Sequence, residues 1–356
     1  MPNPNDSDDI EMQDVVPLLV ESGRGPTPLS PSRRPSEPSS LLLRLDERVN
    51  FKKLSPVYAP YLEWVVRLML VSCFLDDSIR TATQFPQNAE QVSAEGFLPS
   101  KGAADVALGL GLLAQWAGSA CLLRVRQTPG LANFATKALI SWSVLQPALY
   151  GQLANFEFVA DSLSVTGGLV LLRAHLAGGD RVGVGPRAQL FGRLLVPVPY
   201  VYYGGKLLVS ALDLEETGSA AGYVASLGEF VVSTLLFAAM VAGVALVAAG
   251  LKSRLVALAA AVANLAFAFY LHPFFRYVWR EDGKWKYDEN MPMPDVTLPD
   301  GVGIADFELW EIYDLHRYYF FLGVASSGAL FLLAQVGPGD IALQADEQIL
   351  PTRAQD

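Results

Sequence analysis

Apolar stretches long enough to cross a lipid bilayer recur along most of this chain. A bilayer core about 30 Å thick needs roughly 20 apolar residues per helix. Windows of that length predict eight spans, and seven is the alternative because the fourth is short and prolines interrupt the fifth. The spans are Leu62–Thr83, Ala103–Val125, Leu131–Tyr150, Phe158–Leu176, Leu190–Val209, Ala221–Leu251, Leu255–Phe275 and Tyr318–Val336. The sequence therefore predicts an all-α, polytopic membrane helix bundle.

The composition excludes several classes of protein. Hydrophobic residues make up 51% of the 356 residues and charged residues 17%, against about 25% charged in soluble domains. A net charge of −10 argues against nucleic-acid binding, which needs a basic face. Cys73 and Cys121 lie in separate apolar runs, and the three histidines are widely spaced. We therefore expect no disulfide framework, metal or cofactor, and no motif of catalytic chemistry predicts an enzyme.

The chain divides into a membrane domain between two tails. Residues 1–54 include a Pro- and Ser-rich stretch, 25–40, which lacks the apolar periodicity needed to offset chain entropy, so this tail is predicted to be disordered and cytosolic. Residues 55–340 form the predicted transmembrane helical domain, and residues 341–356 a cytosolic C-terminal tail.

Basic residues concentrate in alternate connections between the spans. Cytoplasmic loops carry the excess of Lys and Arg, so this alternation predicts a cytosolic N-terminus and, with eight spans, a cytosolic C-terminus. The basic residues of the predicted cytosolic connections are Arg44, Arg48, Lys52, Lys53, Arg124, Arg126, Arg173, Arg181, Arg187, Lys252 and Arg254. The intervening loops are poor in basic residues or acidic.

The largest predicted lumenal loop covers residues 276–316. Its prolines and glycines (Pro292, Pro294, Pro299, Gly301 and Gly303) argue against a regular element there. Its three tryptophans, Trp279, Trp285 and Trp310, predict packing on the lumenal membrane surface, because indole rings favour the interface.

Charged residues inside the predicted spans are the candidate functional residues, because charge at membrane depth is costly. Asp76 and Arg80 are four residues apart on one helix face and are predicted to neutralise each other in part. Asp77 lies about 100° further round the helix and needs another partner. Glu157 and Asp161 should approach the same depth from the fourth span. Two interpretations stay open: a lumen-facing pocket that binds a ligand, or an interhelical ion-pair network that fixes packing.

Other polar and small residues are predicted to serve packing. Glu63 and Arg67 are expected to form an interfacial pair at the cytosolic end of the first span. Gln146 and Asn264 are interpreted as contacts between helices. Small residues predict close helix approach at Ala114/Gly118, Gly167-Gly168 and Gly204-Gly205.

Four segments resemble, in order, the surfeit locus protein 4 family of endoplasmic-reticulum cargo receptors. Leu70–Phe85 (LVSCFLDDSIRTATQF) is similar to the family's first-helix signature. The weaker similarities are Leu163–Leu172, Gly250–Tyr270 and Tyr318–Ile341. By position, the resemblance makes Asp76, Asp77 and Arg80 the counterparts of the family's charged first-helix motif. It covers roughly Lys52 to Ala345.

The resemblance implies a multi-span receptor that binds soluble secretory cargo proteins in the lumen and engages vesicle coat components. The protein would then reside in the endoplasmic reticulum membrane and cycle to the Golgi, and a homo-oligomer is compatible with this interpretation. The chain departs from the family in its acidic and Pro/Ser-rich N-terminal tail, its long 276–316 loop and a final segment, 348–356, without the usual dilysine signal. These departures indicate a diverged member.

Two other functions are weighed against a receptor. A small-solute transporter would use a broken span, here supplied by Pro197 and Pro199 with Gly204-Gly205, although the two halves show no convincing repeat. A membrane oxidoreductase of the DoxX type is disfavoured by the lack of paired Cys or His residues.

Overall fold

The computed structural model describes residues 59–124, 128–177, 186–212, 220–281, 284–294, 307–339 and 341–343. The predicted disordered tail, residues 1–54, lies outside the described residues, as does most of the C-terminal tail. Helices dominate the described residues. They are α2 (Ala59–Thr83), α3 (Phe85–Glu95), α4 (Lys101–Leu123), α5 (Pro129–Leu149), α6 (Phe156–Ala177), α7 (Pro186–Leu195), α8 (Val198–Leu212), α9 (Ala220–Ala249), α10 (Ser253–Leu271), the 3₁₀ turn η2 (Phe274–Arg276) and α11 (Leu309–Val336).

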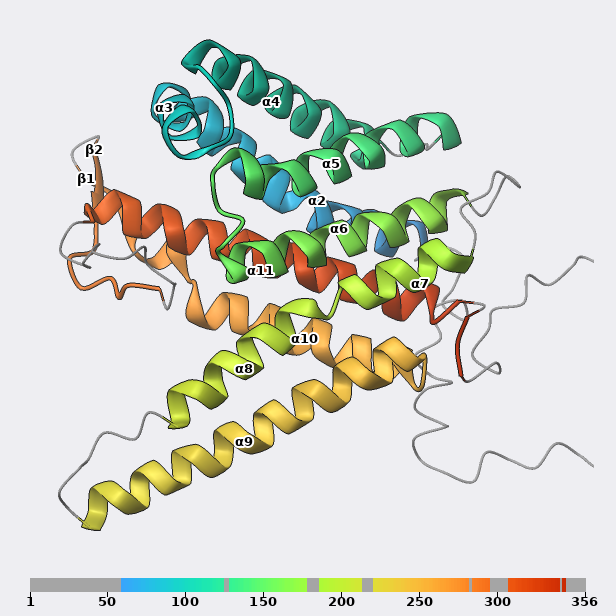
Figure 1. The fold of residues 1–356 in the computed structure, drawn as a ribbon, viewed down its shortest axis with the longest axis vertical. Coiled ribbons are helices and arrows are strands. Elements are labelled where there is room, and N and C mark those ends of the chain that lie inside the picture. Colours follow the sequence, from blue (N-terminus) through green and yellow to red (C-terminus); the bar gives the residue numbers. More distant parts are fainter. Residues whose placement is uncertain are drawn as a thin grey trace, which may run out of the picture.

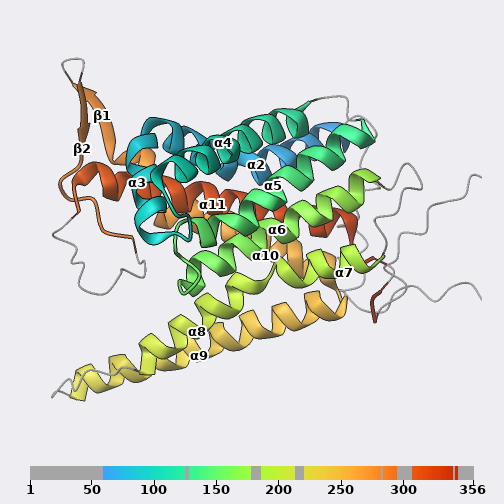
Figure 2. The ribbon, with the colours of Figure 1, turned by 45° about the horizontal axis from the view of Figure 1, so that its top comes forward.

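The long helices form a bundle in which successive helices run in alternating directions (Figures 1 and 2). Each predicted span has a helix, or in one case two helices, at its place in the chain. The start of α2 and the end of α11 lie at one end of the bundle, and α3 lies across the opposite end (Figure 1). The predicted polytopic helix bundle is confirmed.

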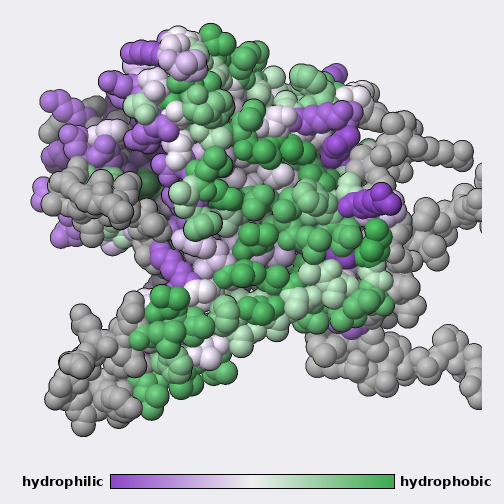
Figure 3. All heavy atoms as spheres, in the orientation of Figure 1, coloured by the Kyte–Doolittle hydropathy of each residue, from purple (hydrophilic) through white to green (hydrophobic). Residues whose placement is uncertain are grey.

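Four of the described helical segments are both long and apolar enough to cross a bilayer: Lys101–Leu123, Leu227–Ala249, Ser253–Arg276 and Leu309–Val336. Helices α2, α5 and α6 have 21 to 25 residues but carry more polar side chains. On the face drawn in Figure 3, hydrophobic residues cover the middle of the molecule, with hydrophilic residues gathered towards its two ends. The total of eight spans stays a prediction.

The fifth predicted span is broken into α7 and α8, as its prolines predict. Pro197 has no N–H to continue the helical hydrogen bonds, and the chain turns there through a Tyr200 N–H bond to the Pro197 carbonyl of 3.1 Å. The Ser164 hydroxyl on α6 donates to the Val196 carbonyl at 2.8 Å. This side chain satisfies a backbone oxygen at the break, as a low-dielectric environment requires.

Helix α11 lies at the centre of the bundle and packs against α2, α6 and α10. Small residues allow this close approach. A Cβ atom added at Gly168 on α6 would lie 2.6 Å from the Ala329 Cβ on α11, and one added at Gly328 would lie 2.8 Å from the Met69 Cβ on α2. Gly118 and Gly167 make similar contacts. For the pair Gly204-Gly205 the predicted helix contact is confirmed at Gly204, where an added Cβ would lie 3.1 Å from the Phe237 ring of α9, and wrong at Gly205, which faces open space.

The prediction that residues 276–316 form no regular element is wrong at both ends of this loop. Residues Val278–Glu281 (β1) and Lys284–Tyr287 (β2) form an antiparallel hairpin in which Trp279 is opposite Lys286, because the loop's prolines all lie beyond it. Helix α11 begins at Leu309, where Glu308 and Glu311 form a reciprocal capping box. Trp279, Trp285 and Trp310 are exposed, and their packing on a membrane surface stays a prediction.

Candidate functional site

Asp76, Asp77 and Arg80 lie in the last two turns of α2, at the end of the bundle that carries the hairpin (Figure 1). Arg80 pairs with Asp77, with 2.9 Å between Nη2 and Oδ1. Arg80 therefore bonds Asp77 directly, and its predicted partial neutralisation of Asp76 acts only as a charge interaction without a direct ion pair. Asp76 instead pairs with Arg317 on α11, with 2.9 Å between Oδ1 and Nε, because α11 packs against α2 on that side.

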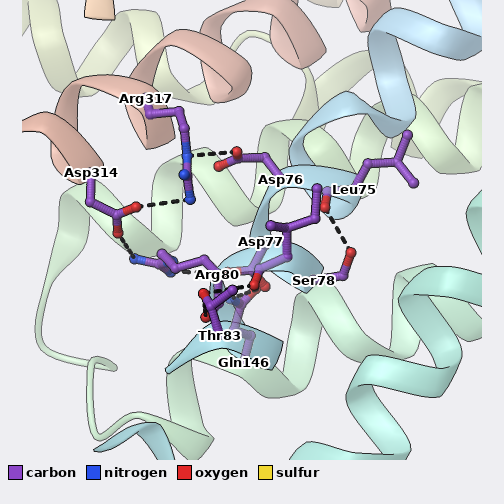
Figure 4. A network of polar contacts seen from close by, with 10 residues as sticks. Leu75, Asp76, Asp77, Ser78, Arg80, Thr83, Gln146, Asp314 and Arg317 are labelled. Carbon is purple, nitrogen blue, oxygen red and sulfur yellow. Dashed lines mark hydrogen bonds and ion pairs between the residues drawn. The ribbon is translucent and has the colours of Figure 1, made fainter. Parts of the chain in front are cut away.

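Helix α11 links the two aspartates of α2 into one network (Figure 4). Arg317 also pairs with Asp314, with 2.8 Å between Nη2 and Oδ1, and these residues are neighbours at i and i+3. The other oxygen of Asp314 lies 3.9 Å from Arg80 Nη1. The ion pairs therefore form the continuous chain Asp77–Arg80–Asp314–Arg317–Asp76, which we call the α2–α11 network.

Helix α5 and an aromatic ring complete the surroundings of this network. The Gln146 side-chain amide on α5 donates to Asp77 Oδ2 at 3.1 Å, so Gln146 binds a charged group rather than only packing between helices. The Arg80 guanidinium lies 5.0 Å from the centre of the Tyr318 ring, which allows a cation–π interaction. Asn264, in contrast, bonds Gly323 and Ser327 on α11, as a predicted interhelical contact should.

The α2–α11 network has more negative than positive charge. It holds three carboxylates, Asp76, Asp77 and Asp314, against two guanidinium groups. The Asp76 and Asp77 side chains are each 7% exposed, whereas those of Arg80 and Arg317 are 23% and 21% exposed. The network is thus largely desolvated, its more exposed groups are the arginines, and one carboxylate has no cation of its own.

The other two predicted site residues belong to a second cluster on α6. Glu157 and Asp161 lie one turn apart and are 3% and 5% exposed. The Tyr203 hydroxyl on α8 lies 3.0 Å from Asp161 Oδ2 and 3.4 Å from Glu157 Oε1. Lys206 Nζ is 3.9 Å from Glu157 Oε2, and Tyr319 on α11 hydrogen-bonds Glu157. We call this group the α6–α8 cluster.

Adjacent tyrosines of α11 stand between the two groups. Tyr318 contacts Arg80 of the α2–α11 network, and Tyr319 contacts Glu157 of the α6–α8 cluster. The five predicted residues are therefore near one another but divided between two sets of partners, with α11 common to both.

Comparison with known protein families assigns the chain to one of them. The model of the SURF4 family matches residues 47–289. The chain belongs to the SURF4 family. The matched residues run from before α2 through the hairpin and include the first-helix segment 70–85, so the resemblance to the surfeit locus protein 4 family is confirmed there. The resemblance of segment 318–341 lies beyond the match. No solved structure matches the chain.

In this SURF4-family chain, Asp314 and Arg317 are the site residues that the sequence analysis missed. Asp314 lies in the 276–316 segment that it assigned to an irregular loop, and Arg317 lies between that loop and the predicted span Tyr318–Val336. Two signals were available: the Glu308-x-x-Glu311 capping box that starts a helix, and the spacing of Asp314 and Arg317, which places them on one helix face. Their partners on α2 had no local signal, because more than two hundred residues separate them.

In this SURF4-family protein the described residues include no group of three or more His, Cys, Asp or Glu side chains placed to hold a metal ion. Cys73 and Cys121 are not joined in a disulfide. The arrangement offers charge recognition and hydrogen bonding, from carboxylates and guanidinium groups that the surrounding helices hold in place.

Proposed function

We propose that this protein is a membrane cargo receptor, which binds soluble secretory proteins in the lumen of the endoplasmic reticulum and promotes their vesicular export to the Golgi. The proposal assigns it binding without catalysis, and vesicle coat components as cytosolic partners. Membership of the SURF4 family supports it. The loop charges support the orientation, since they assign the hairpin end of the bundle to the lumen.

The observation that carries the proposal is the excess carboxylate of the α2–α11 network. Buried charges usually occur in balanced pairs, since an unpaired charge in a low-dielectric site is costly. Asp314, whose side chain is 14% exposed, makes just a long contact of 3.9 Å with Arg80. Its closer partner, Arg317, is shared with Asp76. A cationic group from a cargo protein, such as an N-terminal amine or a basic side chain, would balance the charge.

The test measures the protein content of vesicles budded from endoplasmic reticulum, with and without this protein. Selective loss of a few soluble lumenal proteins would support a receptor and identify its clients. An unchanged cargo profile, with the protein itself packaged into vesicles, would overturn the proposal.

Single substitutions then test the site. Asp314→Asn removes the excess carboxylate and leaves each arginine its closest α2 partner, so it should lower client packaging while the variant still enters vesicles. Asp76→Asn and Asp77→Asn should also lower packaging. Glu63→Gln is the matched control, because the Glu63–Arg67 pair, 3.4 Å apart, lies at the opposite end of α2. If Asp314→Asn and Glu63→Gln packaged clients equally well, the network would have no part in cargo binding.

A transporter of small solutes is the second candidate, and the break between α7 and α8 favours it. Broken helices near buried polar groups mark the substrate sites of many transporters. Here α8 supplies Tyr203 and Lys206 to the carboxylates of α6. Uptake of labelled solutes into proteoliposomes distinguishes the candidates, since a receptor should show no uptake above that of empty liposomes.

A further inference from the structure

Two of the chain's three histidines face each other at the hairpin end of the bundle. His272 is the residue after α10, and His316 lies in the second turn of α11. Their Nδ1 atoms are 3.4 Å apart, and their rings are tilted by 56°. Tyr319 stacks on His272, and Tyr277 contacts His316. Local spacing gave no sign of this pair, because 44 residues separate its members.

The other nitrogen of His316 shows how its ring is held. Nε2 lies 2.7 Å from the carbonyl oxygen of Pro292. A carbonyl only accepts, so Nε2 carries the hydrogen, and Nδ1 of the neutral ring presents its lone pair towards His272. A histidine that binds a metal typically donates its second ring N–H to a backbone carbonyl or carboxylate in this way, which fixes the ring and raises its basicity.

The distance between the facing nitrogens also fits a shared metal ion. Hydrogen bonds from N–H groups usually span about 2.7–3.2 Å, so 3.4 Å is long for a direct bond between the rings. Two nitrogens that each lie about 2.0–2.1 Å from a tetrahedral Zn²⁺ are about 3.3–3.4 Å apart. The described residues also bring no carboxylate into an ion pair with either ring.

We propose that His272 and His316 bind a divalent transition-metal ion through their Nδ1 atoms, with Zn²⁺ the best-fitting ion because imidazole is one of its preferred ligands. The described residues supply two protein ligands, one fewer than zinc sites with a single exchangeable position. Two coordination positions of a tetrahedral ion are therefore open to water or to a ligand from a bound molecule. This proposal does not rest on cargo binding.

A metal ion at this position would fasten three parts of the protein together. It would join the end of α10 to α11 and, through His316, hold the segment that follows the hairpin. That segment already contacts the bundle through the Pro292 carbonyl, which accepts a hydrogen bond from His316, and through Met291, which is 5% exposed. Tyr319, which stacks on His272, also hydrogen-bonds Glu157. The site is therefore placed to stabilise the surroundings of the α6–α8 cluster.

Cobalt binding tests the proposal. The purified full-length protein in detergent is stripped with EDTA and titrated with Co²⁺, whose visible absorption reports four-coordinate binding, and Zn²⁺ is then added as competitor. We expect one Co²⁺ per chain, displaced by Zn²⁺. His272→Asn and His316→Gln should weaken binding by more than about tenfold, the scale of loss seen even for outer-shell partners. His175→Gln, which changes the chain's third histidine, should bind as the unmodified protein does.

Thermal unfolding provides a second readout. Zn²⁺ should raise the melting temperature of the unmodified protein and of His175→Gln but not of His272→Asn, whose amide can still donate to His316 Nδ1 and so preserve the local contact. The proposal is overturned if the stripped protein binds no Co²⁺, or if His175→Gln loses as much binding as the two site variants.

Discussion

Substitutions in the α2–α11 network should destabilise the protein in an order set by how many carboxylates each one leaves without an arginine partner. Asp314→Asn leaves two carboxylates and two arginines, with the 2.9 Å pairs of Arg80 with Asp77 and Arg317 with Asp76 intact. Its cost should be about 1 kcal/mol or less, the range of partly exposed pairs. Arg317→Gln leaves three carboxylates with one arginine.

The cost of Arg317→Gln should be much larger. Asp76, 7% exposed, loses its ion-pair partner, and Asp314 keeps only the 3.9 Å contact with Arg80. Breaking a buried pair from one side typically costs about 3–5 kcal/mol. Asp76→Asn should fall between the two, because Arg317 keeps Asp314 at 2.8 Å. The double variant Asp76→Asn/Arg317→Gln should be more stable than Arg317→Gln alone, since it also removes the Asp76 carboxylate that Arg317→Gln leaves unpaired.

Equilibrium unfolding in mixed detergent micelles, followed by tryptophan fluorescence, measures these free energies. Glu63→Gln is the control on the same helix, with an expected cost of about 1 kcal/mol or less because Glu63 is 27% exposed. If Arg317→Gln costs no more than Asp314→Asn, the charge balance does not govern stability and the reasoning is refuted.

Three further predictions concern packing, the C-terminal segment and topology. Gly168→Ala forces a Cβ to within 2.6 Å of Ala329, so it should lower unfolding free energy by about 1–3 kcal/mol, whereas Gly205→Ala, in open space, should raise it by up to about 1 kcal/mol; the same unfolding assay compares them. Arg193 is buried and donates to the Pro338 carbonyl, so Arg193→Gln should release the segment after α11, and a faster limited proteolysis there would show it. A tag on the N-terminus should be digested by protease added outside intact microsomes, and protection of the tag would contradict the predicted orientation.

The sequence predicted the helices well because each helix satisfies its own backbone hydrogen bonds within a single apolar stretch. The break at Pro197 was equally predictable, since a missing N–H is a local property. The Glu63–Arg67 pair, which lies within one helix, was also found. These successes share one property, which is that all the interacting groups lie within a few residues.

Interactions between distant segments were not predictable in the same way. Asp76 has two cations within reach of its helix face, and only the packing of α11 decides that Arg317 is its partner. The start of α11 was missed because Asp314 and Arg317 interrupt the apolar window, although they are compatible with a helix once they are paired. The facing pair of His272 and His316 likewise depends on how α10 and α11 meet.

The central position of α11 has a consequence for how the protein is made. Helices enter the membrane in the order of their synthesis, so α2 arrives with Asp76, Asp77 and Arg80 long before α11 exists. At about 5–20 residues per second, roughly 10 to 50 s separate the synthesis of Arg80 from that of Asp314. During that time Asp76 lacks the Arg317 guanidinium that pairs with it in the finished bundle. We therefore expect a chain that stops before α11 to leave Asp76 without its ion-pair partner, so that completion of the chain is itself a step in assembly.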